Sequence, residues 1–218
     1  MSGRRNGPNM FTAIKTTDPK LLSELRKVLV KAIENNYHSK NYIVPLEEAH
    51  ITITVLGVEN ENEQFVAGAF RRALEENLSD IKRFKKDIQF QGLDCFGDKV
   101  LYARPTTGLD FLNKLRQILE KSIVDNPSKI ENHCYPTYNP HLTMFHIKYV
   151  TNNFTDKLYK YFSRGANHDG VNLYEVAQSF RNTDFGCQSA TSIQLCKMGS
   201  ENRTDDGYWQ VIEEVKLE

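Results

Sequence analysis

A tetrapeptide of alternating polar and apolar residues occurs twice in this chain, as His50-Ile51-Thr52-Ile53 and as His141-Leu142-Thr143-Met144. Both copies of this HxT motif lie in β-branched, apolar surroundings that predict strands, over 50–58 and over 141–150. Alternate residues of a strand point to the same face, so each copy presents an imidazole and a hydroxyl side by side while its apolar residues face the core. The repeat therefore predicts two half-sites on two similar strands.

Hydrophobic periodicity predicts the elements around each motif. The first half of the chain is expected to form strand, helix, strand, helix, strand and strand, over 10–15, 18–33, 50–58, 65–78, 87–93 and 100–104, with a polar loop over 37–48. The second half is expected to contain a helix over 110–123, a loop over 126–139, the second HxT strand, a short helix over 155–162, a mostly irregular stretch over 165–186, and a closing hairpin of 192–198 with 208–217. We expect residues 1–9 to be a flexible tail.

No linker-like composition separates the two halves of the chain. We therefore expect residues 10–218 to form a single bilobal α+β domain, in which the two HxT strands are related by a pseudo-twofold axis and meet across a central cleft. Lys plus Arg and Asp plus Glu balance at 28 each, so no overall field attracts a long nucleic-acid duplex and local groups must hold any anionic ligand.

The cysteine and hydropathy patterns indicate in which cellular compartment the protein is expected. The four cysteines show no CxxC spacing and no apolar signal segment precedes them, which predicts reduced thiols in a cytoplasmic or nuclear protein. No apolar run approaches the roughly 18 residues that a membrane-spanning helix needs, so no membrane partner is expected. We expect the protein to be a monomer.

Two facing imidazoles are the minimum apparatus for breaking a phosphodiester by acid–base catalysis. We interpret His50 and His141 as the pair, one taking a proton from an attacking hydroxyl or water and the other protonating the departing oxygen. Thr52 and Thr143 would hydrogen-bond the non-bridging phosphate oxygens. A ribose hydroxyl beside the scissile bond is the obvious nucleophile in an RNA-like substrate.

Several other interpretations compete with this one. A histidine followed two residues later by threonine is most often a packed or surface residue, and only the matching second copy favours a site. Two histidines without a third ligand do not make a typical zinc site, so neither a metal nor a cofactor is predicted. No GxSxG elbow supports a serine nucleophile. His146 lies five residues after His141 and is expected on the opposite strand face.

Aromatic and basic side chains supply candidate contacts to a polynucleotide. The basic stretch 82–86 is expected to be a solvated face. Tyr138 is the best candidate for stacking on a base because it lies just before the second motif. The other aromatic candidates are Phe96, Tyr102, Tyr135, Phe145 and Trp209.

The two motifs and their flanks resemble the two-histidine (2H) phosphoesterases of the LigT-like superfamily, and more narrowly the phosphoesterase domain of A-kinase anchoring proteins. The resemblance implies two antiparallel-rich sheets around a cleft lined by His50, Thr52, His141 and Thr143, with helices packed outside. It also implies nucleoside monophosphate binding and metal-free cleavage of 2′,5′-linked oligoadenylate. It rests on His50-Ile51-Thr52, Phe90-Gln91-Gly92-Leu93, Phe96-Gly97, Pro140-His141-Leu142-Thr143, Leu173-Tyr174-Glu175, Leu195-Cys196-Lys197-Met198 and Gly207-Tyr208.

Three functional hypotheses follow. The first is a metal-independent phosphodiesterase acting on 2′,5′-oligoadenylate or short RNA. The second is a regulatory or scaffold module that binds AMP-like nucleotides without turning them over. The third is an enzyme that opens 2′,3′-cyclic phosphates or trims RNA 3′ ends. Since no amphipathic anchoring helix is predicted outside the domain, kinase anchoring is not expected.

Overall fold

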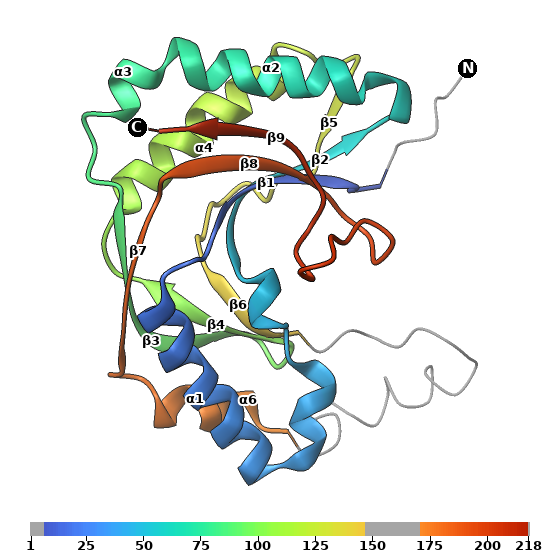
Figure 1. The fold of residues 1–218 in the computed structure, drawn as a ribbon. Coiled ribbons are helices and arrows are strands. Elements are labelled where there is room, and N and C mark those ends of the chain that lie inside the picture. The colour runs from blue at the N-terminus through green and yellow to red at the C-terminus, as the bar shows by residue number, and fades with distance from the viewer. Residues whose placement is uncertain (1–6, 147–170, 218) are drawn as a thin grey trace.

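The computed structural model describes residues 7–146 and 171–217, whose strands form one curved antiparallel sheet in the order β7-β3-β4-β6-β2-β1-β8-β9 (Figure 1). A short strand, β5, pairs with β2 beside this path. The predicted α+β class is confirmed. The strands are β1 (Met10–Lys15), β2 (His50–Val58), β3 (Asp87–Phe96), β4 (Val100–Pro105), β5 (Ile130–Asn132), β6 (Leu142–His146), β7 (Asp184–Ser189), β8 (Ser192–Lys197) and β9 (Val211–Lys216).

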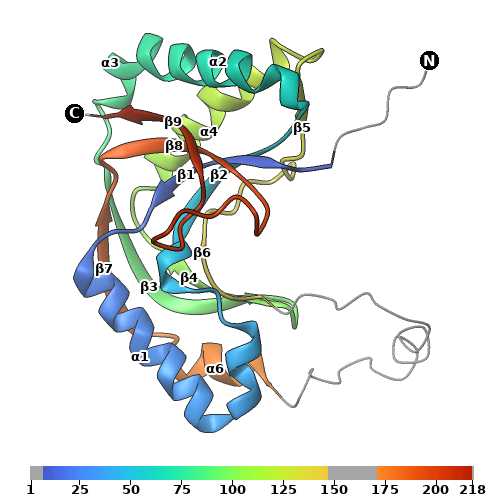
Figure 2. The same cartoon turned by 45° about the vertical axis from the view of Figure 1, so that its right-hand side comes forward.

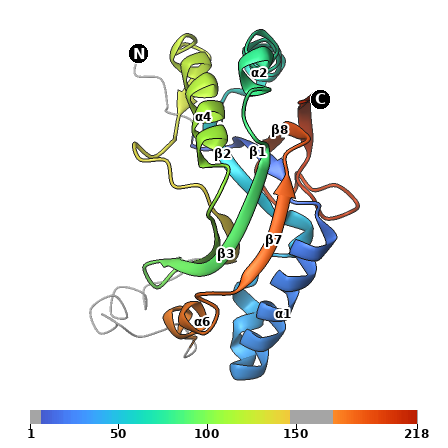
Figure 3. The ribbon, with the colours of Figure 1, turned by 90° about the vertical axis from the view of Figure 1, so that its left-hand side faces the viewer.

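The two expected sheets are halves of this continuous sheet. β2 and β6 are joined by a single residue pair, Ile51 with Leu142, whereas the other neighbours along the path pair over longer stretches. We call β1, β2, β8 and β9 with their helices the upper lobe, and β3, β4, β6 and β7 with theirs the lower lobe, as they lie in Figure 1. Figure 3 shows β3 and β7 running between the helices of the two lobes.

The helices lie outside the sheet, as expected (Figures 1 and 2). Two of them pack on the lobe opposite to that of the strand they follow. The helix α1 follows β1 of the upper lobe but packs on β7 of the lower lobe, and α4 follows β4 of the lower lobe but packs on β2 and β5 of the upper lobe. α2 packs on β9 and α6 on β3. The helices are α1 (Pro19–Asn35), α2 (Glu63–Glu76), α3 (Leu78–Ile81), α4 (Leu109–Val124) and α6 (Leu173–Ser179).

Local sequence explains the start and the buried face of α1. Asp18 is its N-cap, with a side-chain oxygen that accepts a hydrogen bond from the Leu21 amide at 2.7 Å, and Pro19 occupies the first turn. The predicted apolar stripe is buried at Leu21, Leu25 and Val28, among others. None of the helices in the described part of the chain is long and apolar enough to cross a membrane.

Each HxT strand carries a β-bulge directly after its threonine. In β2 the register against β1 shifts so that Ile53 is the extra residue, and in β6 the register against β4 shifts so that Met144 is the extra residue. These are the fourth residues of the two tetrapeptides. Because the bulge shifts the alternation by one, His146 returns to the face of His141, and the prediction that it faces the opposite side is wrong.

Other predictions differ from the structure at short elements. The polar loop 37–48 contains two 3₁₀ turns, Tyr37–Tyr42 and Leu46–Glu48, and the predicted loop 126–139 contains β5. The prediction that 165–186 is mostly irregular is wrong where α6 and the start of β7 lie. The predicted helix 155–162 and the end of the second HxT strand, 147–150, lie outside the described residues.

The predicted tail over 1–9 ends earlier than expected. Residues 1–6 lie outside the described part of the chain. Asn9 is fastened to β2, since its side chain donates to the Val58 carbonyl at 2.7 Å and accepts from the Val58 amide at 2.9 Å. Contacts with the sheet therefore begin before β1.

Candidate active site

The Ile51–Leu142 pair brings the two HxT motifs to one face of the sheet. The strands are antiparallel at this pair, so His50 lies across from Thr143 and Thr52 lies across from His141. Ile51 and Leu142 are fully buried, whereas the four histidine and threonine residues are partly exposed. The sequence-predicted site residues are thus grouped around one residue pair.

The two histidines are diagonal neighbours in this arrangement. Diagonal positions on adjacent antiparallel strands lie about 7–8 Å apart, with their Cβ atoms somewhat closer, which leaves room for two imidazoles to contact opposite sides of one phosphate. His141 also acts electrostatically on His50 and lowers its pKa. The expected convergence of the two half-sites is present in the structure.

Both imidazoles are held through the same ring nitrogen. Nδ1 of His50 lies 2.6 Å from the carbonyl oxygen of Glu48, and Nδ1 of His141 lies 2.7 Å from the carbonyl oxygen of Asn139. A carbonyl oxygen can only accept, so Nδ1 carries the proton in each ring and Nε2 is the nitrogen left for chemistry. The i−2 carbonyl therefore sets the same tautomer in both motifs.

Aromatic rings surround each histidine. The Phe11 ring centroid lies 4.8 Å from that of His50, and the Trp209 ring stands edge-on to His50 at 6.3 Å. Phe96 and Tyr102 lie 4.8 Å and 5.3 Å from His141. These rings take water away from the imidazoles, which disfavours their charged forms.

The pKa values of both histidines reflect this environment. The pKa of His50 is lowered from 6.5 to about 4, mainly by burial and to a smaller extent by His141 and Arg203, against the raising effect of the Glu48 carbonyl. Burial likewise lowers the pKa of His141, against the raising effect of the Asn139 carbonyl. Both rings are therefore neutral at pH 7 in the free protein, each with an unprotonated Nε2.

Sequence reasoning missed the charged contacts beside His50. Arg203, in the connection between β8 and β9, forms an ion pair with Glu48 at 2.8 Å, and its Cζ lies 3.2 Å from the Trp209 ring centroid. This connection descends from the upper lobe in Figure 2. Because Glu48 and Arg203 are 155 positions apart, no local pattern could have indicated the contact.

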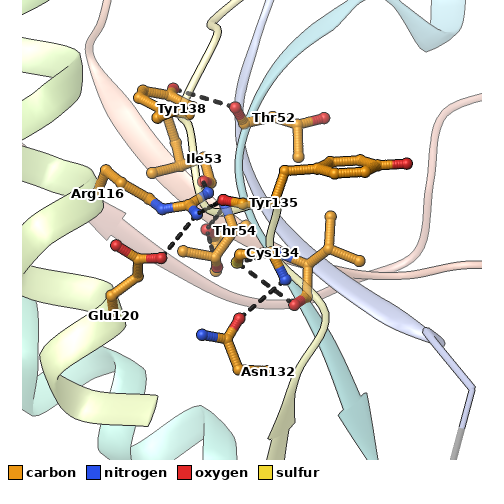
Figure 4. Close-up of polar contacts among 11 residues, drawn as sticks. Thr52, Ile53, Thr54, Arg116, Glu120, Asn132, Cys134, Tyr135 and Tyr138 are labelled. Carbon is orange, nitrogen blue, oxygen red and sulfur yellow. Dashed lines mark hydrogen bonds and ion pairs between the residues drawn. The ribbon is translucent and has the colours of Figure 1, made fainter. Parts of the chain in front are cut away.

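A buried arginine fastens the chain behind the first motif (Figure 4). Arg116 of α4 is 7% exposed; it donates to the Ile53 carbonyl at 2.8 Å and the Tyr135 carbonyl at 3.0 Å, and it pairs with Glu120 at 2.6 Å. These bonds tie α4, β2 and the segment 132–139 together. The segment that leads into the second motif is thereby held against the strand of the first.

Tyr138 is part of the same set of contacts between the segment 132–139 and β2. Its hydroxyl donates to the Thr52 carbonyl at 3.1 Å, its ring packs against the main core, and the Arg116 guanidinium lies over the ring at 5.1 Å (Figure 4). The structure thus gives the predicted stacking residue a set of structural partners. The exposed ring of this segment is Tyr135, which is 84% exposed and extends away from Arg116 in Figure 4.

Two further sequence expectations concern cations and metals. The basic stretch 82–86 is largely exposed, and its Arg83 pairs with Asp80 at 3.4 Å. Among residues 7–146 and 171–217, no three His, Cys, Asp or Glu side chains are arranged to hold a metal ion.

Comparison with known proteins identifies the family. The model of the AKAP7 2′5′ RNA ligase-like domain matches residues 8–217. This chain belongs to that family, within the LigT-like 2H phosphoesterase superfamily. Human A-kinase anchor protein 7 isoform gamma is 23% identical over 214 residues, which cover 93% of this chain and 55% of the human protein. The chain thus spans about half the length of this relative.

Solved structures of other proteins share the fold. Escherichia coli LigT complexed with 3′-AMP matches with a TM-score of 0.53 at 14% identity, over 96% of this chain and 98% of LigT. The protein TT0787 of Thermus thermophilus matches with a TM-score of 0.55 at 17% identity, over 96% of this chain and 97% of that protein. At these identities the comparison establishes the architecture, and the site has to be argued from this chain's own residues.

Proposed function

We propose that this 2H phosphoesterase is a metal-independent phosphodiesterase that cleaves 2′,5′-linked oligoadenylate, with His50 and His141 as its acid–base pair. The observation that carries the proposal is the matched anchoring of the two rings, which leaves both Nε2 atoms for one shared substrate. LigT, a structural relative, has been crystallised with 3′-AMP and with NADP⁺, which supports a nucleotide as the ligand.

The reaction is an in-line transfer of the phosphoryl group to a neighbouring ribose hydroxyl. Nε2 of His50 takes the proton of the 3′-hydroxyl, whose oxygen attacks the phosphorus of the 2′,5′ linkage. The bond from phosphorus to the 5′-oxygen breaks, and Nε2 of His141 gives that oxygen a proton. The products are a 2′,3′-cyclic phosphate and a free 5′-hydroxyl.

The order of the two roles follows from the environments of the rings. His50 has its pKa lowered to about 4 and is close to a guanidinium, so it stays neutral and serves as the base. The bound phosphodiester is an anion, and a nearby negative charge raises the pKa of an imidazole. His141, whose pKa is lowered by burial and not by a neighbouring cation of the described chain, takes up the proton and serves as the acid.

The threonines and an exposed tyrosine complete the proposed site. Thr52 and Thr143 lie beside the histidines on the same face, where their hydroxyls can donate to the non-bridging oxygens as charge develops. Tyr135 offers an exposed ring on a fastened segment, which favours stacking on a nucleobase at little conformational cost.

The test is a substrate panel in EDTA. Wild-type protein should cleave 2′,5′-linked oligoadenylate to the cyclic product, identified by mass spectrometry, faster than 3′,5′-linked or 2′,3′-cyclic substrates. His50→Ala and His141→Ala should each lower kcat by about 10²–10⁴-fold, the usual contribution of one acid or base. Full activity in either variant would refute the assignment.

A binding module is the second candidate function. It is favoured by the lowered pKa values of both histidines, since the free protein holds neither of them as an imidazolium acid at pH 7. Calorimetry with AMP beside the cleavage assay separates the two. Saturable AMP binding without any product from the panel would support the module and exclude the enzyme.

A further inference from the structure

The two residues that anchor the imidazoles are themselves held by their side chains. Glu48 and Asn139 each precede a motif histidine by two positions, and each offers its main-chain carbonyl to Nδ1. Arg203 forms an ion pair with the Glu48 side chain, and the Tyr102 hydroxyl is hydrogen-bonded to the Asn139 side chain. We call these two side-chain partners the clamps of the motifs. The clamp of the first motif, Arg203, is charged, whereas the clamp of the second motif, Tyr102, is neutral.

The clamp of the first motif is a half-buried cation. The Arg203 guanidinium lies between the Glu48 carboxylate at 2.8 Å and the face of Trp209, with Cζ 3.2 Å from the ring centroid. A backbone bridge also joins Arg203 to Trp209, and the Trp209 ring in turn contacts His50. The second terminal nitrogen, Nη1, is buried without a hydrogen-bond partner among the described residues. A positive charge that is held in place by one carboxylate and one ring thus lies beside His50.

The clamp of the second motif is a buried phenol. Tyr102 is 5% exposed, stacks on Phe96 with 4.3 Å between ring centroids, and lies 5.3 Å from the His141 ring. It lies across from Thr143 in the β4–β6 register, so it shares the site face. Burial raises the pKa of its hydroxyl, which keeps the group uncharged at neutral pH.

We propose that Arg203 and Tyr102 are positioning residues that give the two equivalent histidines different roles, with Arg203 adding a fixed positive charge beside the buried His50 that favours the neutral base, and Tyr102 orienting His141 without opposing its protonation. The inference deepens the proposed function and depends on it for the meaning of base and acid. The clamps themselves, and their effect on each ring, are properties of the substrate-free protein.

Other charged groups around His50 do not account for the asymmetry. Lys15 lies across from His50 in the β1–β2 register, but its Nζ pairs with Asp206 at 3.4 Å and lies over the Tyr208 ring at 4.0 Å. The charges that act on His50 are those of Arg203 and, from the second motif, His141. Around His141, Phe96 is uncharged, and the nearby charges of Asp94 and Arg104 act on Tyr102 with opposite signs.

The first test needs no substrate. The pKa values of His50 and His141 are measured by NMR titration of the imidazole protons in wild-type protein and in Arg203→Gln. We expect the pKa of His50 to rise because the guanidinium charge is gone, and the pKa of His141 to stay where it is. An unchanged His50, or equal rises in both rings, would overturn the role of Arg203.

Two conservative variants distinguish a loss of the Arg203 charge from a general disturbance of the fold. Arg203→Lys keeps the charge and should keep the pKa of His50 low. Glu48→Gln leaves the guanidinium charge in the chain and should also keep the pKa of His50 low, in contrast to Arg203→Gln. A general loosening of the site would raise the pKa in all three variants, and that result would overturn the proposal.

The second test is the pH dependence of kcat/KM. The acidic limb, set by the base, should move to higher pH in Arg203→Gln and stay in place in Tyr102→Phe. Tyr102→Phe should lower kcat about fivefold through loss of one hydrogen bond, with neither histidine pKa changed. Unchanged kcat in Tyr102→Phe would remove Tyr102 from the proposal. If no substrate in the panel is cleaved, the proposed function fails, while the NMR titration still decides the effect of Arg203.

Discussion

Ile51 pairs with Leu142, and this pair both joins the two lobes through the sheet and aims both histidines at one face. Each partner stands between the histidine and the threonine of its motif. Both side chains are fully buried under the face opposite the site. Packing behind the sheet and geometry in front of it therefore depend on the same two residues.

Truncating one of this pair should affect activity beyond its effect on stability. Leu142→Ala should lower the free energy of unfolding by about 2–5 kcal/mol, as for other buried leucines, and should also lower kcat of the folded fraction because His141 and Thr143 flank the new cavity. Leu25→Ala in α1, equally buried, is the control and should lose stability alone. Urea unfolding and kcat at saturating substrate measure the two effects; equal kcat in both variants would contradict the prediction.

Replacing the threonine hydroxyls should affect the chemical step. Thr52→Val and Thr143→Val keep the shape but remove the donor, and each should lower kcat about 10²-fold, the scale of a lost oxyanion donor. Thr52→Ser and Thr143→Ser should keep most of the activity. If the valine variants raise KM and leave kcat alone, the hydroxyls bind the ground state only.

The exposed ring of Tyr135 should matter for substrate binding. Tyr135→Ala should raise KM for oligoadenylate about tenfold, because a base–aromatic stack contributes about 1–3 kcal/mol. Stability should be unchanged, since the side chain is 84% exposed. Tyr135→Phe should behave as wild type, and a large effect of that variant would indicate a hydroxyl contact in place of stacking.

Arg116 should be a stability residue. Arg116→Met leaves the carbonyls of Ile53 and Tyr135 without their donor, and it should lower the free energy of unfolding by about 3 kcal/mol, given about 1.5–3 kcal/mol for each hydrogen bond to a charged group. Arg116→Lys restores the charge without the two-pronged geometry and should recover part of this loss. Urea denaturation compares the three proteins, and a fully stable Arg116→Met would contradict the estimate.

The lowered pKa of His50 predicts how stability depends on pH. The unfolded chain binds a proton at this residue near pH 6.5, whereas the folded protein does so near pH 4, so the unfolded state holds more protons in between. The contribution of His50 to stability is therefore complete above pH 6.5 and is lost as the pH falls toward 4. Urea midpoints of wild type and His50→Gln should converge over this range; parallel curves would show that the ring is not held neutral.

Local patterns in the sequence were enough to predict the long elements and to place the four motif residues on one face of two strands. β1, α1 and β2 follow from apolar periodicity, the Asp18-Pro19 start signal and the alternation of the HxT motif. β5 is three residues long and exists because it pairs with the end of β2, and α6 has a single buried turn, so neither has a periodic signal of useful length. The contacts of Arg203 with Glu48 and of Tyr102 with Asn139 form only in the folded structure. No spacing in the sequence could have predicted them.

The interleaving of the lobes has a consequence for synthesis on the ribosome. β1 lies between β2 and β8, and β8 in turn holds β9, so the upper lobe takes its strands from both ends of the described chain. Nascent β1 and β2 can pair with each other early, but the second edge of β1 must wait until β8 (Ser192–Lys197) has emerged. A ribosome stalled after α4 would therefore display the first histidine on an unfinished sheet, open to chaperones and incapable of catalysis.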